Sequence, residues 1–120
     1  MKKIFFFLFF ALLLACTKPG PGGKGSIKGF IKHHDKPIPS SVVYIKYGAT
    51  ESPGTNVTYY DESVNTDANA NYEFPDLKKG AYYLFGVGFD SAIGKPVSGG
   101  VPVVIKSKTE TVETDVPVTE

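Results

Sequence analysis

Apolar and polar side chains alternate along much of this chain, a pattern that is typical of β-strands. Over residues 42–47 the alternation places Val43, Ile45 and Tyr47 on one face of a strand, and residues 111–118 alternate in the same way. From residue 26 onward no segment shows a convincing apolar period of 3.6 residues. Strand-forming runs cover residues 27–32, 42–47, 57–64, 72–74, 81–89, 101–106 and 111–118. About seven short strands predict an all-β, antiparallel β-sandwich.

Turn-forming residues separate these runs. Pro37 and Pro39 fix the backbone angle φ and cannot donate to a strand ladder, so residues 36–39 are predicted to form a turn. Residues 67–71 are rich in Asp and Asn, whose side chains bond to their own backbone, and they predict a hairpin turn. Residues 90–100 are predicted to form a long loop.

The N-terminal segment has the composition of a secretory signal peptide. Lys2 and Lys3 precede an apolar run over residues 4–14, which is shorter than the roughly 20 residues needed to span a bilayer. The run ends in Leu-Leu-Ala followed by Cys16, the only cysteine, and these four residues resemble the lipobox of bacterial lipoproteins. The resemblance implies cleavage after residue 15 and modification of Cys16 with diacylglycerol and, on its new amino group, usually a fatty acid such as palmitate.

Such a lipoprotein would be anchored to a lipid bilayer through acylated Cys16, because two or more acyl chains give stable attachment. In Gram-negative lipoproteins an Asp after the cysteine retains the protein in the inner membrane. Thr17 follows Cys16 here, so the outer membrane is favoured, and exposure on its periplasmic or its outer surface is left open. Residues 16–25 contain Gly, Pro and Lys without a large apolar side chain, and we expect a flexible tether there. The predicted domain then covers residues 26–120.

Charge excludes one class of partner. After residues 1–15 are removed, eleven lysines face twelve acidic residues, and the chain has no arginine. The lysines are scattered rather than clustered along one run. Nucleic-acid binding is therefore not expected.

Several motifs in the middle of the chain resemble the carboxypeptidase regulatory-like domains, which are related to transthyretin-like and collagen-adhesin B-type domains. The similarity extends from residue 26 to about residue 89 and rests on the segments Ile-Lys-Gly-Phe-Ile at 27–31 and Thr-Asp-Ala-Asn-Ala-Asn-Tyr-Glu-Phe at 66–74, followed by Leu77, Gly80, Tyr82 and Leu84. Asp35, Ser40 and Ala70 stand where the family has turn glycines. The resemblance implies an Ig-like or transthyretin-like β-sandwich that serves as a spacer, a stabilising module or a binding unit without catalytic activity.

Two clusters of polar residues could hold a metal ion, and simpler interpretations are favoured for both. His33, His34 and Asp35 are adjacent, neighbouring side chains on a strand point to opposite sides, and the chain has no other histidine, so a solvated turn is expected. Asp67, Asn69 and Asn71 resemble the start of a calcium loop without its glycine and glutamate, which favours the hairpin turn over weak Ca²⁺ binding. No metal site and no cofactor is predicted.

The sequence contains no recognisable catalytic motif. The mature chain would have no cysteine nucleophile, and no serine lies in a Gly-x-Ser-x-Gly motif. We therefore expect a protein that is not an enzyme.

Aromatic residues suggest two candidate binding surfaces. The strand at 81–89 is apolar on both faces, and Tyr83, Phe85, Val87 and Phe89 lie on the face opposite the expected core. These four side chains either are covered by the loop at 90–100, which is the favoured interpretation, or bind a partner protein. Tyr59 and Tyr60 could instead bind a glycan. The sequence thus predicts a membrane-anchored envelope lipoprotein that acts as a non-enzymatic accessory or protein-interaction module, with a carbohydrate-binding module as the alternative.

Overall fold

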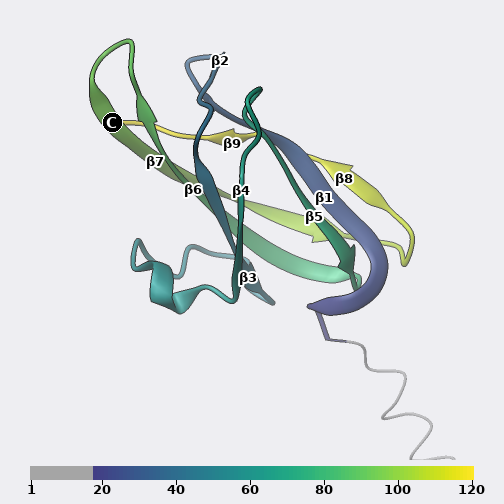
Figure 1. Ribbon diagram of the computed structural model, residues 1–120. Helices are drawn as coiled ribbons and strands as arrows, with labels where there is room; N and C mark the ends of the chain where they lie inside the picture. Colours follow the sequence, from purple (N-terminus) through teal and green to yellow (C-terminus); the bar gives the residue numbers. More distant parts are fainter. Residues whose placement is uncertain (1–17) are drawn as a thin grey trace, which may run out of the picture.

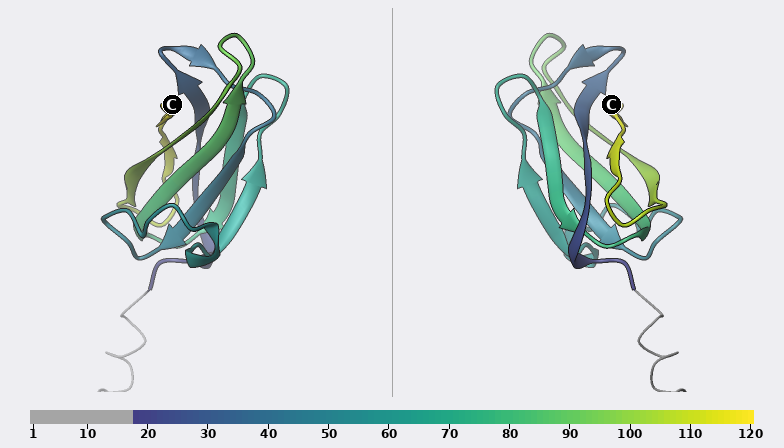
Figure 2. Two further views of the ribbon diagram at one scale, coloured as in Figure 1. Left: turned by 90° about the vertical axis from the view of Figure 1, so that its left-hand side faces the viewer. Right: turned by 90° about the vertical axis from the view of Figure 1, so that its right-hand side faces the viewer.

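The computed structural model describes residues 18–120, which form two β-sheets packed face to face (Figures 1 and 2). The expected signal peptide and Cys16 lie outside the described residues. The elements are β1 (Pro21–His33), β2 (Lys36–Pro37), β3 (Val42–Tyr47), the 3₁₀ turn η1 (Val57–Tyr59), β4 (Glu62–Asn65), β5 (Asn71–Leu77), β6 (Gly80–Asp90), β7 (Lys95–Ile105), β8 (Thr111–Glu113) and β9 (Val116–Pro117). The predicted all-β sandwich is confirmed. Among residues 18–120 there is no helix long and apolar enough to cross a membrane.

The first sheet is organised around β1. This strand pairs with β2 and β5 in antiparallel orientation, and with β8 and β9 in parallel orientation. The parallel pairs differ from the purely antiparallel sandwich that was predicted. They form because the chain crosses from the second sheet after β7 and then runs beside β1 in the same direction (Figure 1).

The second sheet is antiparallel throughout, in the order β4-β3-β6-β7. The predicted alternation in β3 is confirmed, since Val43 and Ile45 are fully buried and Tyr47 is half-buried. The fully buried side chains of both sheets form one core between them. The largest are Tyr82, Phe74, Ile27, Ile31, Ile38, Ile45, Leu77, Leu84 and Ile105.

Residues 90–100 do not form the predicted long loop. β6 and β7 form a hairpin whose register runs from Asp90 opposite Lys95 to Gly80 opposite Ile105, with Gly94 in the left-handed region of the turn. Gly99 and Gly100 give this segment the appearance of a loop in the sequence. Within the strand their missing side chains leave room for close neighbours, because a Cβ on Gly99 would lie 2.2 Å from the carbonyl oxygen of Pro117.

The predicted tether is also shorter than expected, because β1 begins at Pro21 and its first residues pair with β5. The tether was predicted because residues 16–25 lack large apolar side chains. The pairing with β5, however, is made by backbone hydrogen bonds and requires small side chains at close approach. A Cβ on Gly23 would lie 2.2 Å from the carbonyl oxygen of Leu77. Gly20 is also hydrogen-bonded to the domain: its N–H donates to the hydroxyl of Tyr82 at 2.8 Å, and its carbonyl oxygen accepts from the N–H of Lys78 at 2.8 Å.

Asp35, Ser40 and Ala70 adopt positive φ angles of 65°, 58° and 66°. These are the three positions at which the sequence departs from the turn glycines of the family it resembles. Each of these turns adopts the left-handed conformation that glycine favours, and a residue with a Cβ occupies it. Such a conformation costs about 1–2 kcal/mol per residue.

Candidate functional site

The outer face of the first sheet carries a groove of about 440 Å³ that passes over β1. Strand register decides which side chains border it. Phe30 lies opposite Asn71 of β5, and Lys28 lies between Glu73 of β5 and Glu113 of β8. The remaining side chains of the lining come from the ends of β4, β5 and β8: Asn65, Asp67, Tyr72 and Asp115.

Phe30 is the exposed aromatic residue of this groove, with 41% of its surface accessible, whereas Tyr72 is buried. Its backbone N–H donates to Oδ1 of Asp115 at 3.2 Å, which fixes that carboxylate beside the phenylalanine. Asp115 is held from the other side by Lys32, whose Nζ lies 3.1 Å from Oδ2. The groove therefore presents an exposed ring, with the Asp115 carboxylate held beside it and Asn71 opposite it on β5.

The turn at Asp67 closes one end of the groove, and it has the predicted hairpin geometry. Oδ1 of Asp67 accepts the backbone N–H groups of Asn69 and Asn71, each at 2.9 Å. The backbone hydrogen bond from Asn71, followed by that from Asn69, lowers the pKa of the Asp67 carboxyl. The carboxylate thus stabilises its own turn, and its Oδ2 also accepts from the side-chain amide of Asn71 at 3.4 Å.

The four side chains predicted to form a partner-binding face do not form one exposed patch. Phe85 is 6% exposed because Tyr60 stacks on it, with ring centroids 5.6 Å apart, and Tyr44 covers a second side at 6.4 Å. Tyr83 is half-buried and packs over Gly100, where a Cβ would lie 2.6 Å from the tyrosine ring. Phe85 is therefore covered by Tyr60, from the segment before β4, and by Tyr44 of β3, rather than by the loop that was predicted over residues 90–100.

Val87 and Phe89 complete that predicted face. Val87 is half-buried, whereas Phe89 is 55% exposed at the end of β6. Of the four residues, Phe89 is the one whose ring is open to solvent.

The two tyrosines predicted as a glycan site have different surroundings. Tyr59 is 56% exposed, whereas Tyr60 is partly buried against Phe85 and donates its hydroxyl to the carbonyl oxygen of Gly54 at 2.8 Å. They do not form a platform of two exposed rings.

The Phe30 groove was not predicted, although the sequence pattern of β1 indicates that Phe30 faces outward. Ile27 and Ile31 assign the inward face of β1, and this phase places Phe30 outward.

His34 and Asp35 lie in an exposed turn, as predicted, whereas His33 is buried at the end of β1. His33 is 4% exposed, and its Nδ1 lies 2.9 Å from Oδ2 of Asp90, a residue that is itself buried. Lys36 donates from Nζ to Oδ1 of the same carboxylate at 2.7 Å. The hydrogen bond from His33, together with that from Lys36, holds the pKa of Asp90 well below its usual range.

Comparison with known proteins supports the fold. No family model and no curated protein sequence matches the chain. Among solved structures it is similar to a provisionally assigned carbohydrate-binding protein from Pseudomonas aeruginosa, with 14% identity and a TM-score of 0.55 over 87% of this chain and 93% of that one. It is also similar to the major pilin subunit of Bacillus cereus, with 14% identity and a TM-score of 0.54 over 82% of this chain and 30% of the pilin. At this level of identity both similarities concern the β-sandwich fold.

Proposed function

We propose that this chain is a lipid-anchored protein of the bacterial cell envelope, that it is not an enzyme, and that its sandwich domain binds carbohydrate in the Phe30 groove. One observation carries the binding proposal: the exposed Phe30 lies between Asn71, its register partner on β5, and Asp115, whose carboxylate accepts the Phe30 N–H. A sugar ring offers an apolar face to an aromatic side chain and hydroxyl groups to amides and carboxylates at its edge. The similarity in fold to a provisionally assigned carbohydrate-binding protein also supports carbohydrate binding.

The anchoring proposal rests on the lipobox-like residues that end at Cys16. A further observation supports it at the end of the sandwich where β1 begins. Four lysines line a surface depression of about 380 Å³ there, namely Lys24, Lys78, Lys79 and Lys108. Each lysine held near an anionic lipid surface contributes about 1 kcal/mol of attraction.

Lipid anchoring is tested by metabolic labelling. In cells, the intact chain should incorporate an alkyne-tagged fatty acid, and Cys16→Ser should abolish the label. Labelling that survives this substitution would contradict the proposed anchor.

Carbohydrate binding is best tested by affinity electrophoresis of the full chain in gels containing bacterial and plant polysaccharides, followed by calorimetry on the retained class. Phe30→Ala should weaken binding roughly tenfold, which corresponds to about 1.4 kcal/mol. Asn71→Ala should act in the same direction. Tyr59→Ala is the matched control, because Tyr59 is an exposed aromatic residue outside the groove. If Tyr59→Ala loses carbohydrate binding and Phe30→Ala retains it, the binding site lies at the segment around Tyr59 and not in the Phe30 groove.

A second function is favoured by the exposed side chains near the β6–β7 hairpin. Phe89 and Ile93 are 55% and 45% exposed, and Phe89 lies opposite Pro96 in the register. This small apolar surface suits contact with another envelope protein. Crosslinking in cells should then retain one dominant envelope protein, and Phe89→Lys should release it. Unchanged capture by Phe89→Lys would contradict this function.

A further inference from the structure

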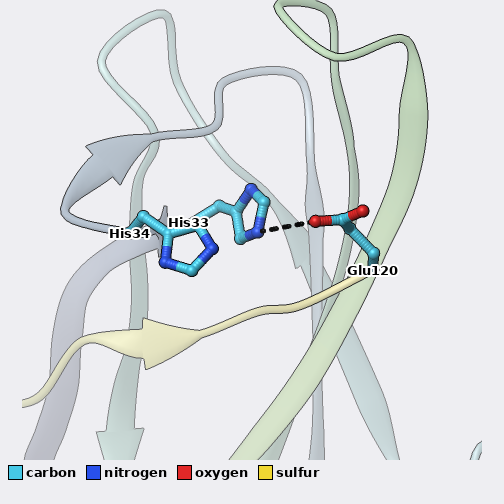
Figure 3. Close-up of side chains that lie close together, drawn as sticks. All are labelled: His33, His34 and Glu120. Atoms are coloured by element: carbon cyan, nitrogen blue, oxygen red, sulfur yellow. Dashed lines mark ion pairs between the residues drawn. The ribbon is translucent and has the colours of Figure 1, made fainter.

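The turn between β1 and β2 brings the two histidine rings together. His34 and Asp35 have positive φ angles of 50° and 65°, so the chain leaves the extended conformation immediately after His33. In a continuous strand neighbouring side chains would diverge. Here the ring centroids of His33 and His34 are 4.3 Å apart (Figure 3).

A carboxylate from the far end of the chain lies at the same place. The N–H of Val118 donates to the carbonyl oxygen of Lys32, and Thr119 forms an isolated bridge with Ser98. These bonds hold Glu120 next to the histidines, with its Oε1 3.8 Å from Nε2 of His33 (Figure 3). One possible ligand atom from each of His33, His34 and Glu120 lies within 4.8 Å of the others.

The Nε2 atom of His33 is the decisive feature of this cluster. It is buried and has no hydrogen-bond partner among the described residues. A buried polar atom left unpaired costs about 1–3 kcal/mol, so such atoms call for an explanation. The other ring nitrogen, Nδ1, is bonded to the buried carboxylate of Asp90. A carboxylate can only accept, so Nδ1 carries the hydrogen, which leaves Nε2 as the atom of this ring that can bind a metal ion, 3.8 Å from Oε1 of Glu120.

We propose that His33, His34 and Glu120 form a binding site for Zn²⁺, in which water or an external ligand takes the fourth position. Two imidazole nitrogens and one carboxylate oxygen are a common ligand set for zinc, whereas Ca²⁺ and Mg²⁺ prefer oxygen ligands alone. The bond from Asp90 to His33 is the outer-shell arrangement that orients metal-binding histidines. Asp90 is thus a positioning residue for this site.

The surroundings set the expected strength of binding. Zinc bonds are about 2.0–2.2 Å long, so the exposed side chains of His34 and Glu120 must move slightly inward. Lys95 lies 3.6 Å from Oε2 of Glu120, which leaves Oε1 directed toward His33. The positive charges of Lys95 and Lys36 oppose a cation, and we therefore expect a Kd in the micromolar range.

The site lies at the opposite end of the sandwich from the start of β1, near β2 and the β6–β7 hairpin (Figure 2). A zinc ion there would be remote from the four lysines and separate from the Phe30 groove. The proposal is therefore independent of anchoring and of carbohydrate binding.

The test is calorimetric titration of the full chain with ZnCl₂, together with the visible absorption of added Co²⁺, which becomes intense in tetrahedral sites. All samples carry Cys16→Ser to remove a competing thiol, have no histidine tag, and have nothing added after Glu120. One equivalent of Zn²⁺ should bind. His34→Ala and Glu120→Gln should each weaken binding at least tenfold, while Asp35→Asn, which changes an exposed neighbouring carboxylate, should leave the Kd unchanged.

Both ligand variants change exposed side chains, so their circular dichroism should match that of the parent chain. Asp90→Asn should weaken zinc binding about tenfold to a hundredfold and alter the Co²⁺ spectrum, a change that a purely structural role would not produce. The proposal fails if the parent chain binds no zinc in the micromolar range. It also fails if folded His34→Ala and Glu120→Gln proteins bind as tightly as the Asp35→Asn control.

Discussion

The ring of Tyr60 stacks on the ring of Phe85, with their planes inclined by 20° and their centroids 5.6 Å apart. This contact joins the segment before β4 to the outer face of the second sheet. It buries a strand that is apolar on both faces within a domain of modest size. Phe85 therefore belongs to the packed interior, whereas Phe89, four residues further along the same strand, remains open to solvent.

Phe85→Lys and Phe89→Lys should consequently have very different effects on stability. A charge at residue 85 must be desolvated beneath Tyr60, which we expect to cost about 3 kcal/mol or more. The same change at residue 89 should alter the free energy of unfolding by less than about 0.5 kcal/mol. Urea unfolding followed by circular dichroism measures both values, and equal losses would show that Phe85 is not packed as described.

Gly29 should be essential for the parallel contact between β1 and the segment joining β8 to β9. A Cβ at this position would lie 1.8 Å from the carbonyl oxygen of Thr114, whose N–H bonds to Lys28. Gly29→Ala must push these strands apart, and the expected loss is about 3 kcal/mol. Gly25→Ala is the graded control, because the nearest contacts of its Cβ would be 3.1–3.2 Å and a small shift can relieve them. A smaller effect for Gly29 than for Gly25 in thermal unfolding would contradict the parallel pairing.

Ser40 offers a position at which a glycine should stabilise the domain. It is exposed and has a φ angle of 58°, a conformation that costs a residue with a Cβ about 1–2 kcal/mol. Part of this gain is offset because glycine makes the unfolded chain more flexible. Ser40→Gly should therefore raise the free energy of unfolding by about 0.5 kcal/mol. Ser63→Gly, in an exposed strand position without positive φ, should lower it, and the two variants are compared by melting temperature.

Alkaline pH should destabilise the fold through buried tyrosines. Burial raises the pKa of the Tyr72 hydroxyl far above its usual value, and the charge of Asp115 adds to the effect. A pKa raised in the folded state means that the stabilising contribution is complete below the unfolded value of about 10 and is lost as the pH rises above it. The free energy of unfolding should thus decline above about pH 10.

Tyr72→Phe provides the control for this pH dependence. The variant loses the hydrogen bond from the Tyr72 hydroxyl to the carbonyl oxygen of Thr114, so it should be less stable at neutral pH. It should also show a shallower decline above about pH 10, because one titrating group has been removed. A decline as steep as that of the parent chain would assign the effect to other groups, such as Tyr47 and Tyr82, whose pKa values burial also raises.

The alternation of apolar residues determined the fold class of this protein and the face that each main strand buries. Side chains on a strand point to opposite sides in turn, so Val43 and Ile45 could be assigned to the core without knowledge of any partner strand. Local backbone chemistry similarly fixed the hairpin at Asp67, whose side chain bonds to residues only two and four positions away. The glycines of residues 22–25 and 99–100 were misread, because their role is to admit a neighbouring backbone or ring that the sequence does not reveal.

Tertiary structure alone decided where the candidate sites lie. Phe30 becomes part of a groove because residues about 40 and 85 positions away lie beside it, and such distances are set by strand pairing rather than by local pattern. His33 and Glu120 meet for the same reason, after β9 has run alongside β1. The sequence therefore determined which side chains face inward, through interactions between near neighbours. Which polar side chains meet one another depended on how the two sheets were assembled.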